Sequence, residues 1–151
     1  MEELTLRVSS FKKMKLDDKD KIVRYYCYAE IHEIPKVLSE FNTHRNEPDG
    51  GEEEESSALN LMLKSPHRFH LMTKPITVLA SKVHYDNRRK IVTVILSEAN
   101  DDGVYRGGAL LDIIFLHRNE DECQRWIYVE LELLTGIEPD MMEQIAYQRS
   151  L

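Results

Sequence analysis

Two runs of β-forming residues joined by a short polar link constrain the fold of this chain more than any other feature. Residues 75–85 (PITVLASKVHY) and 90–97 (KIVTVILS) are rich in β-branched residues, and only the polar sequence DNRR separates them. We therefore predict that residues 76–85 and 90–96 pair as antiparallel strands, with residues 126–133 in the same sheet. A sheet that contains such a hairpin is not the all-parallel sheet of a doubly wound fold.

The remainder of the chain adds short strands and helices around this hairpin. Strands are expected at residues 4–8, 23–31 and 126–134, and helices at residues 34–41, 56–64, 109–119 and 138–149. Residues 12–21 are expected to form an exposed connection, and the helix at 56–64 to turn Leu59, Met62 and Leu63 inward. The order β-β-α-α-β-β-α-β-α predicts one α+β domain over residues 1–151, with a mixed sheet containing a β-hairpin and helices packed on it.

The negative charge of the chain is concentrated in one segment. Residues 42–57 (NTHRNEPDGGEEEESS) hold six acids and one arginine, which is most of the formal net charge of -7. Such a run predicts a solvated acidic loop at about 42–57, whose residues 46–57 are dispensable for folding. The alternative is an acidic arm that contacts a protein partner through Glu52, Glu53, Glu54 and Glu55. Direct nucleic-acid binding is not expected, because it normally requires clustered Lys and Arg.

The sequence argues against a membrane segment, a metal site and a cofactor. No apolar run reaches the roughly 20 residues needed to cross a bilayer, and the first residues lack the order of a signal peptide, so a cytoplasmic protein is expected. Cys27 and Cys123 are far apart and predict two reduced thiols rather than a zinc site. His67 and His70 are expected in extended chain without a carboxylate at ligand spacing, and the four other histidines, His32, His44, His84 and His117, at the surface.

The sequence lacks the common catalytic motifs, and its aromatic residues do not indicate a base-stacking site. Neither Gly-x-Ser-x-Gly, Gly-Lys-Ser/Thr nor His-Glu-x-x-His occurs, and Cys27 lies inside a predicted strand without a neighbouring base. The aromatic residues of two predicted strands could stack on bases, but without interleaved basic residues they are expected in the core or on sheet faces: Tyr25, Tyr26, Tyr28, Trp126 and Tyr128.

A Gly-Gly turn at residues 103–114 (GVYRGGALLDII) remains as the strongest candidate for a binding site. A run of apolar residues follows the tight turn at Gly107 and Gly108, as at the start of a helix. Three interpretations stay open: a tight strand-to-helix turn, an anion site formed by the free amides of the helix start with Arg106, Gly107 and Gly108, or a catalytic loop. Asp101 and Asp102 just before the turn fit either an ordinary loop or a magnesium site.

Five segments in order resemble the AIPR family, the abortive-infection phage-resistance proteins of bacteria. They are RFHLMTKPIT (68–77), VHYDN (83–87), GVYRGGALLDII (103–114), YVELELLTGIE (128–138) and IAYQRSL (145–151), and they span roughly half the chain. The family's Gly-rich loop typically reads Asp-Gly-Gly-His-Thr. Here it corresponds to Arg106-Gly107-Gly108-Ala109-Leu110, so the glycines are kept and the Asp, His and Thr are not. The chain is similar to a shortened and altered N-terminal part of the family.

The resemblance implies a protein of phage–host conflict, and the altered loop favours a non-catalytic binding protein over an enzyme. Its expected binding features are the acids Glu52 to Glu55 and the Arg106 turn, and its expected partner is a protein. Two alternatives stay open: a small acidic inhibitor of a bacterial defence nuclease, and a nucleotide-handling enzyme domain of the AIPR kind that uses Asp101, Asp102 and Arg106.

Overall fold

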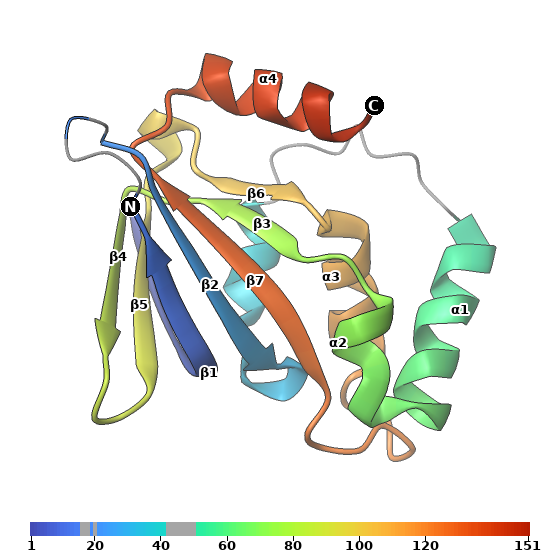
Figure 1. Cartoon of the computed structure of the whole chain (residues 1–151). Helices are drawn as coiled ribbons and strands as arrows, with labels where there is room; N and C mark the ends of the chain where they lie inside the picture. The colour runs from blue at the N-terminus through green and yellow to red at the C-terminus, as the bar shows by residue number, and fades with distance from the viewer. Residues whose placement is uncertain (16–18, 20, 42–50) are drawn as a thin grey trace.

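The protein folds as one α+β domain built on a mixed sheet. The computed structural model describes residues 1–15, 19, 21–41 and 51–151, with the side chains of residues 51–54 excepted. Its seven strands follow the order β4-β5-β1-β2-β7-β3-β6, and only the β3–β7 pair is parallel. The strands are β1 (Glu2–Met14), β2 (Val23–Glu30), β3 (Ile76–Leu79), β4 (Lys82–Asp86), β5 (Ile91–Leu96), β6 (Gly103–Arg106) and β7 (Tyr128–Thr135). The fold class expected from the sequence is therefore confirmed (Figure 1).

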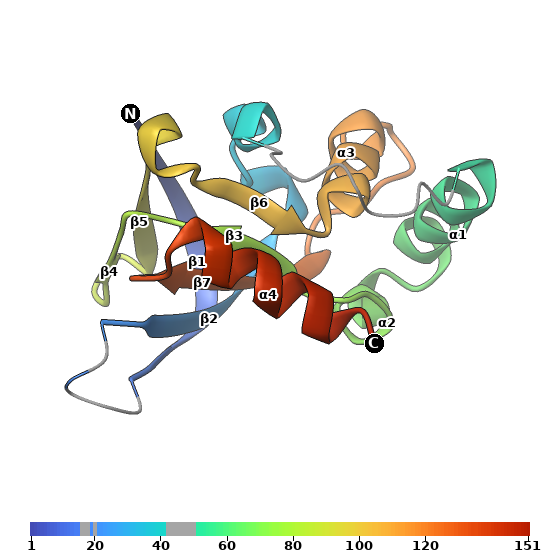
Figure 2. The same cartoon turned by 90° about the horizontal axis from the view of Figure 1, so that it is seen from above.

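Helices cover both faces of the sheet. The α-helices are α1 (Gly51–Lys64), α2 (Phe69–Met72), α3 (Gly108–His117) and α4 (Pro139–Arg149), and short 3₁₀ helices span Ile31–Glu33, Lys36–Phe41, Pro66–Arg68 and Glu98–Asn100. Figure 2 shows α4 on the opposite face from α3. The main core lies on the α3 face, where Cys27, Leu131 and Ile76 meet Leu111 and Ile114. A smaller cluster of Leu79, Tyr105, Leu134, Ile137 and Met142 lies beneath α4.

The predicted hairpin is present, but its first arm is shorter than expected. β4 and β5 pair antiparallel from Lys82↔Ile95 to Asp86↔Ile91, and β7 belongs to the same sheet. The single strand predicted over residues 76–85 is wrong, because the chain changes neighbours in its middle. The amide of Ala80 donates to the Leu134 carbonyl of β7, whereas the amide of Ser81 donates to the Ile95 carbonyl of β5. Two residues thus connect strands far apart in the strand order, so the sheet curls back on itself.

Three other predicted boundaries are corrected. β1 continues to Met14 through a bulge at Ser10, where φ is 56°, so the exposed connection begins later than residue 12. The chain from Pro66 to Met72 is helical rather than extended. The helix predicted over residues 34–41 is present as a 3₁₀ helix, Lys36–Phe41. The short strand β6 was not among the predicted strands, although a strand-to-helix turn was one interpretation of the glycines that follow it.

The acidic segment is also different from the expected loop. α1 begins at Gly51, so residues 51–57 are helical, which is consistent with the favourable position of acids in the first turns of a helix. Residues 42–50 lie outside the described part of the chain. Among the described side chains of α1, Ala58 and Met62 are buried and Leu59 is partly buried against the core, whereas Leu63 is exposed. The inward orientation predicted for Leu63 is wrong.

A buried carboxylate fixes α4 to the sheet. Glu132 of β7 is only 3% exposed, and it accepts hydrogen bonds from Thr77 Oγ1 at 2.9 Å, Arg24 Nε at 2.7 Å and Arg149 Nη1 at 2.6 Å. Burial alone would raise the pKa of the Glu132 carboxyl, but the bonds from Arg149, Thr77 and Arg24 hold this pKa below its ordinary value. Because Arg149 is in the last turn of α4, the carboxylate connects the C-terminal helix to β2, β3 and β7.

We expect Glu132→Gln to lower the free energy of unfolding by about 2 kcal/mol at neutral pH, because it leaves two guanidinium groups without their carboxylate. The lowered pKa gives the wild-type carboxylate a stabilising contribution that is present above about pH 4.3 and is lost as the pH falls through the folded-state pKa. Urea unfolding at several pH values measures both effects. Glu130→Gln, two residues earlier on the same strand face, is the matched control and should change stability little; equal losses in both variants would contradict the assignment.

Candidate functional site

The glycine turn lies between β6 and the first turn of α3. Gly107 has a φ of 86°, in the left-handed region, and α3 begins at Gly108. A Cβ atom on Gly107 would lie 2.9 Å from Ile76 Cγ1 and 3.1 Å from Ile76 Cα of β3. Both the backbone conformation and the close approach to β3 therefore require glycine at this position. The strand-to-helix turn predicted from the sequence is present, with the positive φ at Gly107 and not at Gly108.

The amides of this turn could face an anion, with Arg106 beside them, but Arg106 also belongs to the sheet. It ends β6, where it pairs with Thr77 of β3, and its side chain is half-buried. Anion binding by Arg106, Gly107 and Gly108 stays a prediction.

The two aspartates before the turn have structural partners. Asp102 is 3% exposed, and its Oδ2 atom accepts hydrogen bonds from the Ser97 amide at 2.8 Å and from Ser81 Oγ at 2.5 Å. Asp101 has a φ of 59°, and its carbonyl accepts a hydrogen bond from the Tyr105 hydroxyl at 2.8 Å. Asp102 thus ties the start of β4 to the end of β5, which supports the loop interpretation. Within the described residues, no cluster of three or more metal-ligating side chains occurs.

The acidic residues proposed as a partner arm are part of α1, and the last of them is bound within the protein. The backbone of Glu52, Glu53 and Glu54 is helical, whereas Glu55 Oε1 lies 2.9 Å from His117 Nε2 at the end of α3. His117 Nδ1 lies 2.7 Å from Glu120 Oε1. Hydrogen bonds to Glu120 and Glu55 raise the pKa of His117, since the imidazolium donates to both carboxylates. The surface position predicted for His117 is therefore wrong.

A second histidine has an unexpected structural role. His32 was also predicted at the surface, yet its Nδ1 lies 2.9 Å from Glu30 and its Nε2 lies 2.6 Å from the Arg118 carbonyl. Arg118 in turn donates through Nη1 to the carbonyls of Ile31 and Ile34. These bonds join the end of β2 to the end of α3 across more than eighty residues of sequence, so no local pattern could have indicated them. His84 is exposed as expected, and His44 lies outside the described residues.

Both cysteines are buried, and the aromatic residues differ in their surroundings. Burial raises the pKa of the Cys27 thiol to about 12, which removes it as a nucleophile, and both cysteines are free and buried. Tyr25 lies in the main core. Tyr26 instead lies near Glu132 and Arg24, and the guanidinium carbon of Arg24 is 4.8 Å from the centroid of its ring. Trp126 differs from the prediction most, since it is 64% exposed and belongs to no strand.

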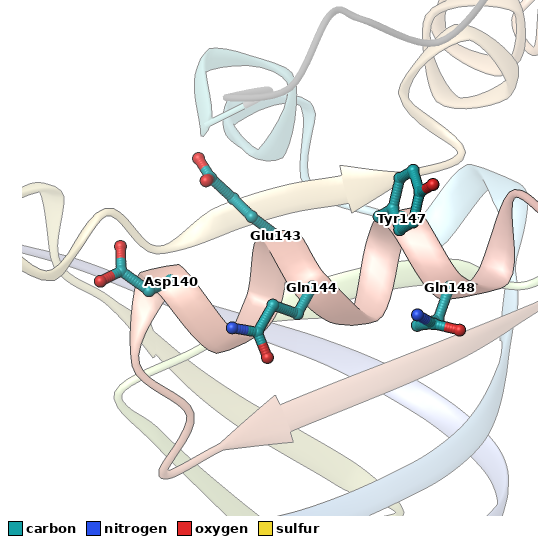
Figure 3. Close-up of a pocket in the computed structure, with 5 residues that line it drawn as sticks. All are labelled: Asp140, Glu143, Gln144, Tyr147 and Gln148. Atoms are coloured by element: carbon teal, nitrogen blue, oxygen red, sulfur yellow. The ribbon is translucent and has the colours of Figure 1, made fainter.

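The hollow detected on the surface of α4 is shallow. Figure 3 shows its lining residues, which all come from this one helix: Asp140, Glu143, Gln144, Tyr147 and Gln148. Because no second element of the described chain supplies a wall, these residues alone do not enclose a small molecule. No helix in the described part of the chain is long and apolar enough to span a membrane.

The structure does not bring the two predicted sites together. Arg106, Gly107 and Gly108 lie at the start of α3, and Glu55 contacts its last turn. Comparison of the chain with family models, curated proteins and solved structures finds no match. The AIPR resemblance therefore remains a prediction from the five sequence segments.

We expect Gly107→Ala to lower the free energy of unfolding by about 1 to 3 kcal/mol, because a Cβ at this φ is strained and meets Ile76. The control is Gly108→Ala at the next position, which is helical without a positive φ and should change stability by less than about 1 kcal/mol. Chemical denaturation of the two variants measures the difference. Equal stability of both variants would show that the left-handed turn is not required.

Proposed function

We propose that this protein is a non-catalytic binding protein of phage–host conflict, as its resemblance to the AIPR family implies. The absence of catalysis is supported by the environment of Asp102, whose carboxylate is buried and hydrogen-bonded to Ser97 and Ser81. The rival enzyme needs Asp101, Asp102 and Arg106 free to act on a phosphate. A carboxylate committed to two protein donors is a poor metal ligand, and Gly107 packs against Ile76 as a structural turn.

The second candidate is a small acidic inhibitor of a bacterial defence nuclease. The observation that favours it is the concentration of negative charge in residues 42–57, which suits a basic, nucleic-acid-binding surface of a nuclease. Both candidates act through protein binding. They differ in the direction of their effect on phage growth.

Added nucleotide or phosphate should not stabilise the protein. We expect no rise in melting temperature with ATP, GTP, CTP or inorganic phosphate, because ligand binding raises the melting temperature only where a site is occupied. Differential scanning fluorimetry of wild type and Arg106→Ala makes the measurement, and the two should behave alike. A nucleotide-dependent rise in wild type that disappears in Arg106→Ala would favour the enzyme.

Phage growth tests the biological part of the proposal. Expression in a laboratory bacterium without an added defence system should lower the plating efficiency of at least one phage in a diverse panel. In a second host that carries a defence nuclease, an inhibitor would instead raise the plating efficiency of a restricted phage. A vector that expresses Gly107→Val, which is expected to disturb the α3 turn, provides the control. Unchanged plating in both hosts would contradict the proposed function.

A further inference from the structure

The link between α3 and β7, residues 118–127, is fixed to the body of the protein at both ends. At its start, Arg118 Nη1 donates to the carbonyls of Ile31 at 2.9 Å and Ile34 at 2.6 Å. At its end, the Ile127 carbonyl accepts from the Ile31 amide at 2.8 Å. In its middle, Cys123 is buried. The link is therefore a closed and anchored loop, which Figure 1 shows at the opposite end of the molecule from α4.

Trp126 is exposed at the end of this anchored loop. Its relative exposure is 64%, although the next residue, Ile127, is completely buried. Its φ of 71° lies in the left-handed region, which a bulky side chain rarely adopts. The Ile127 amide donates to Glu30 Oε2 at 3.2 Å, so the backbone after Trp126 is also bonded. The one tryptophan of the chain is thus exposed to water and has an unfavourable backbone conformation. Such strained conformations are typical of functional positions.

The exposed residues of the link and of the segments next to its ends include apolar and acidic groups. Leu116, in the last turn of α3 just before the link, is 66% exposed. Three exposed acids belong to the link itself, Glu120, Asp121 and Glu122, and exposed Glu33 adjoins the Ile31 and Ile34 carbonyls that Arg118 binds. Arg125 is the exposed cation of the link. We call this set, residues 116–127 with Glu33, the Trp126 surface.

We propose that the Trp126 surface docks a protein partner whose binding face is an apolar pocket bordered by lysine and arginine. Tryptophan is among the side chains most enriched at the energetic centres of interfaces, and the exposed acids of the link complement a basic rim. The same acids repel the phosphates of a nucleic acid. They also disfavour a symmetric dimer of this chain through the surface, because two copies of a surface with more acids than bases repel each other. This inference deepens the proposed function and rests on it.

A selection from random peptides tests the chemistry of the partner. Dodecapeptides displayed on filamentous phage are selected on the wild-type protein and then synthesised. We expect the selected peptides to combine a large apolar residue with lysine or arginine, and to shift the emission of the only tryptophan to the blue as it leaves water. Peptides without basic residues, or peptides that bind without changing the Trp126 emission, would overturn the proposal.

Two variants separate binding from folding. Trp126→Gly should weaken peptide binding about tenfold or more, measured by calorimetry, while its melting temperature stays the same or rises, because glycine accepts the left-handed φ. Tyr147→Ala is the matched control, since Tyr147 is 63% exposed on α4 at the other end of the molecule, and binding should be unchanged. Equal affinities in both variants would overturn the proposal.

Other occupants give distinct signals. A blue shift that grows with protein concentration, together with a dimer in sedimentation that Trp126→Gly abolishes, would overturn the proposal in favour of a second copy. Quenching of Trp126 by a single-stranded oligonucleotide would overturn it in favour of nucleic acid. A plating effect that persists in Trp126→Gly contradicts this surface and leaves the proposed function standing. Peptide binding at Trp126 without any plating effect supports the surface and contradicts the proposed function.

Discussion

The antiparallel pairing of β2 with β7 is the interaction on which the rest of the structure depends. Eight consecutive residues of each strand pair, from Val23↔Thr135 to Glu30↔Tyr128. β2 also pairs with β1, which is followed in the sheet by β5 and β4. β7 also pairs with β3, which is followed by β6. Because the side chains of the two strands alternate between faces, one pairing determines both layers: Cys27 and Leu131 meet the core below α3, and Tyr26 and Glu132 lie opposite each other on the α4 face.

Glu132 makes the register of this central pair specific. A slip of one residue would turn the carboxylate toward the apolar core and its apolar neighbours toward the α4 face, and the hydrogen bonds to Arg24, Thr77 and Arg149 would all be lost. With an apolar residue at this position, a shifted register would bury no charged group, so more than one register would be allowed. A buried ion network contributes little net stability when it is complete, so its main consequence here is the uniqueness of the sheet and the position of α4.

Local patterns predicted the elements well and the long-range contacts poorly. Alternation and β-branched residues were sufficient for β2, for the β4–β5 hairpin and for β7. Two glycines before an apolar run with helical spacing were sufficient for the turn before α3. The break at Ala80 and Ser81 has no glycine or proline to mark it, because it arises from a change of hydrogen-bonding partner between β7 and β5. The acids before Ser56 predicted a solvated loop, whereas residues 51–57 are helical and Glu55 contacts His117 at the end of α3.

The glycine turn and the Trp126 surface lie at the two ends of the same helix. The turn can therefore position this surface without binding or reacting with a ligand. Gly107 lets α3 begin in contact with Ile76 of β3, and this determines where the helix ends ten residues later. At that end, His117 meets Glu55 and Glu120, and Arg118 begins the anchored link that carries Trp126. A larger residue at position 107 would displace α3 and with it the Arg118 anchor at the start of the link. The turn therefore needs glycine at position 107 for its geometry, whether or not an anion binds there.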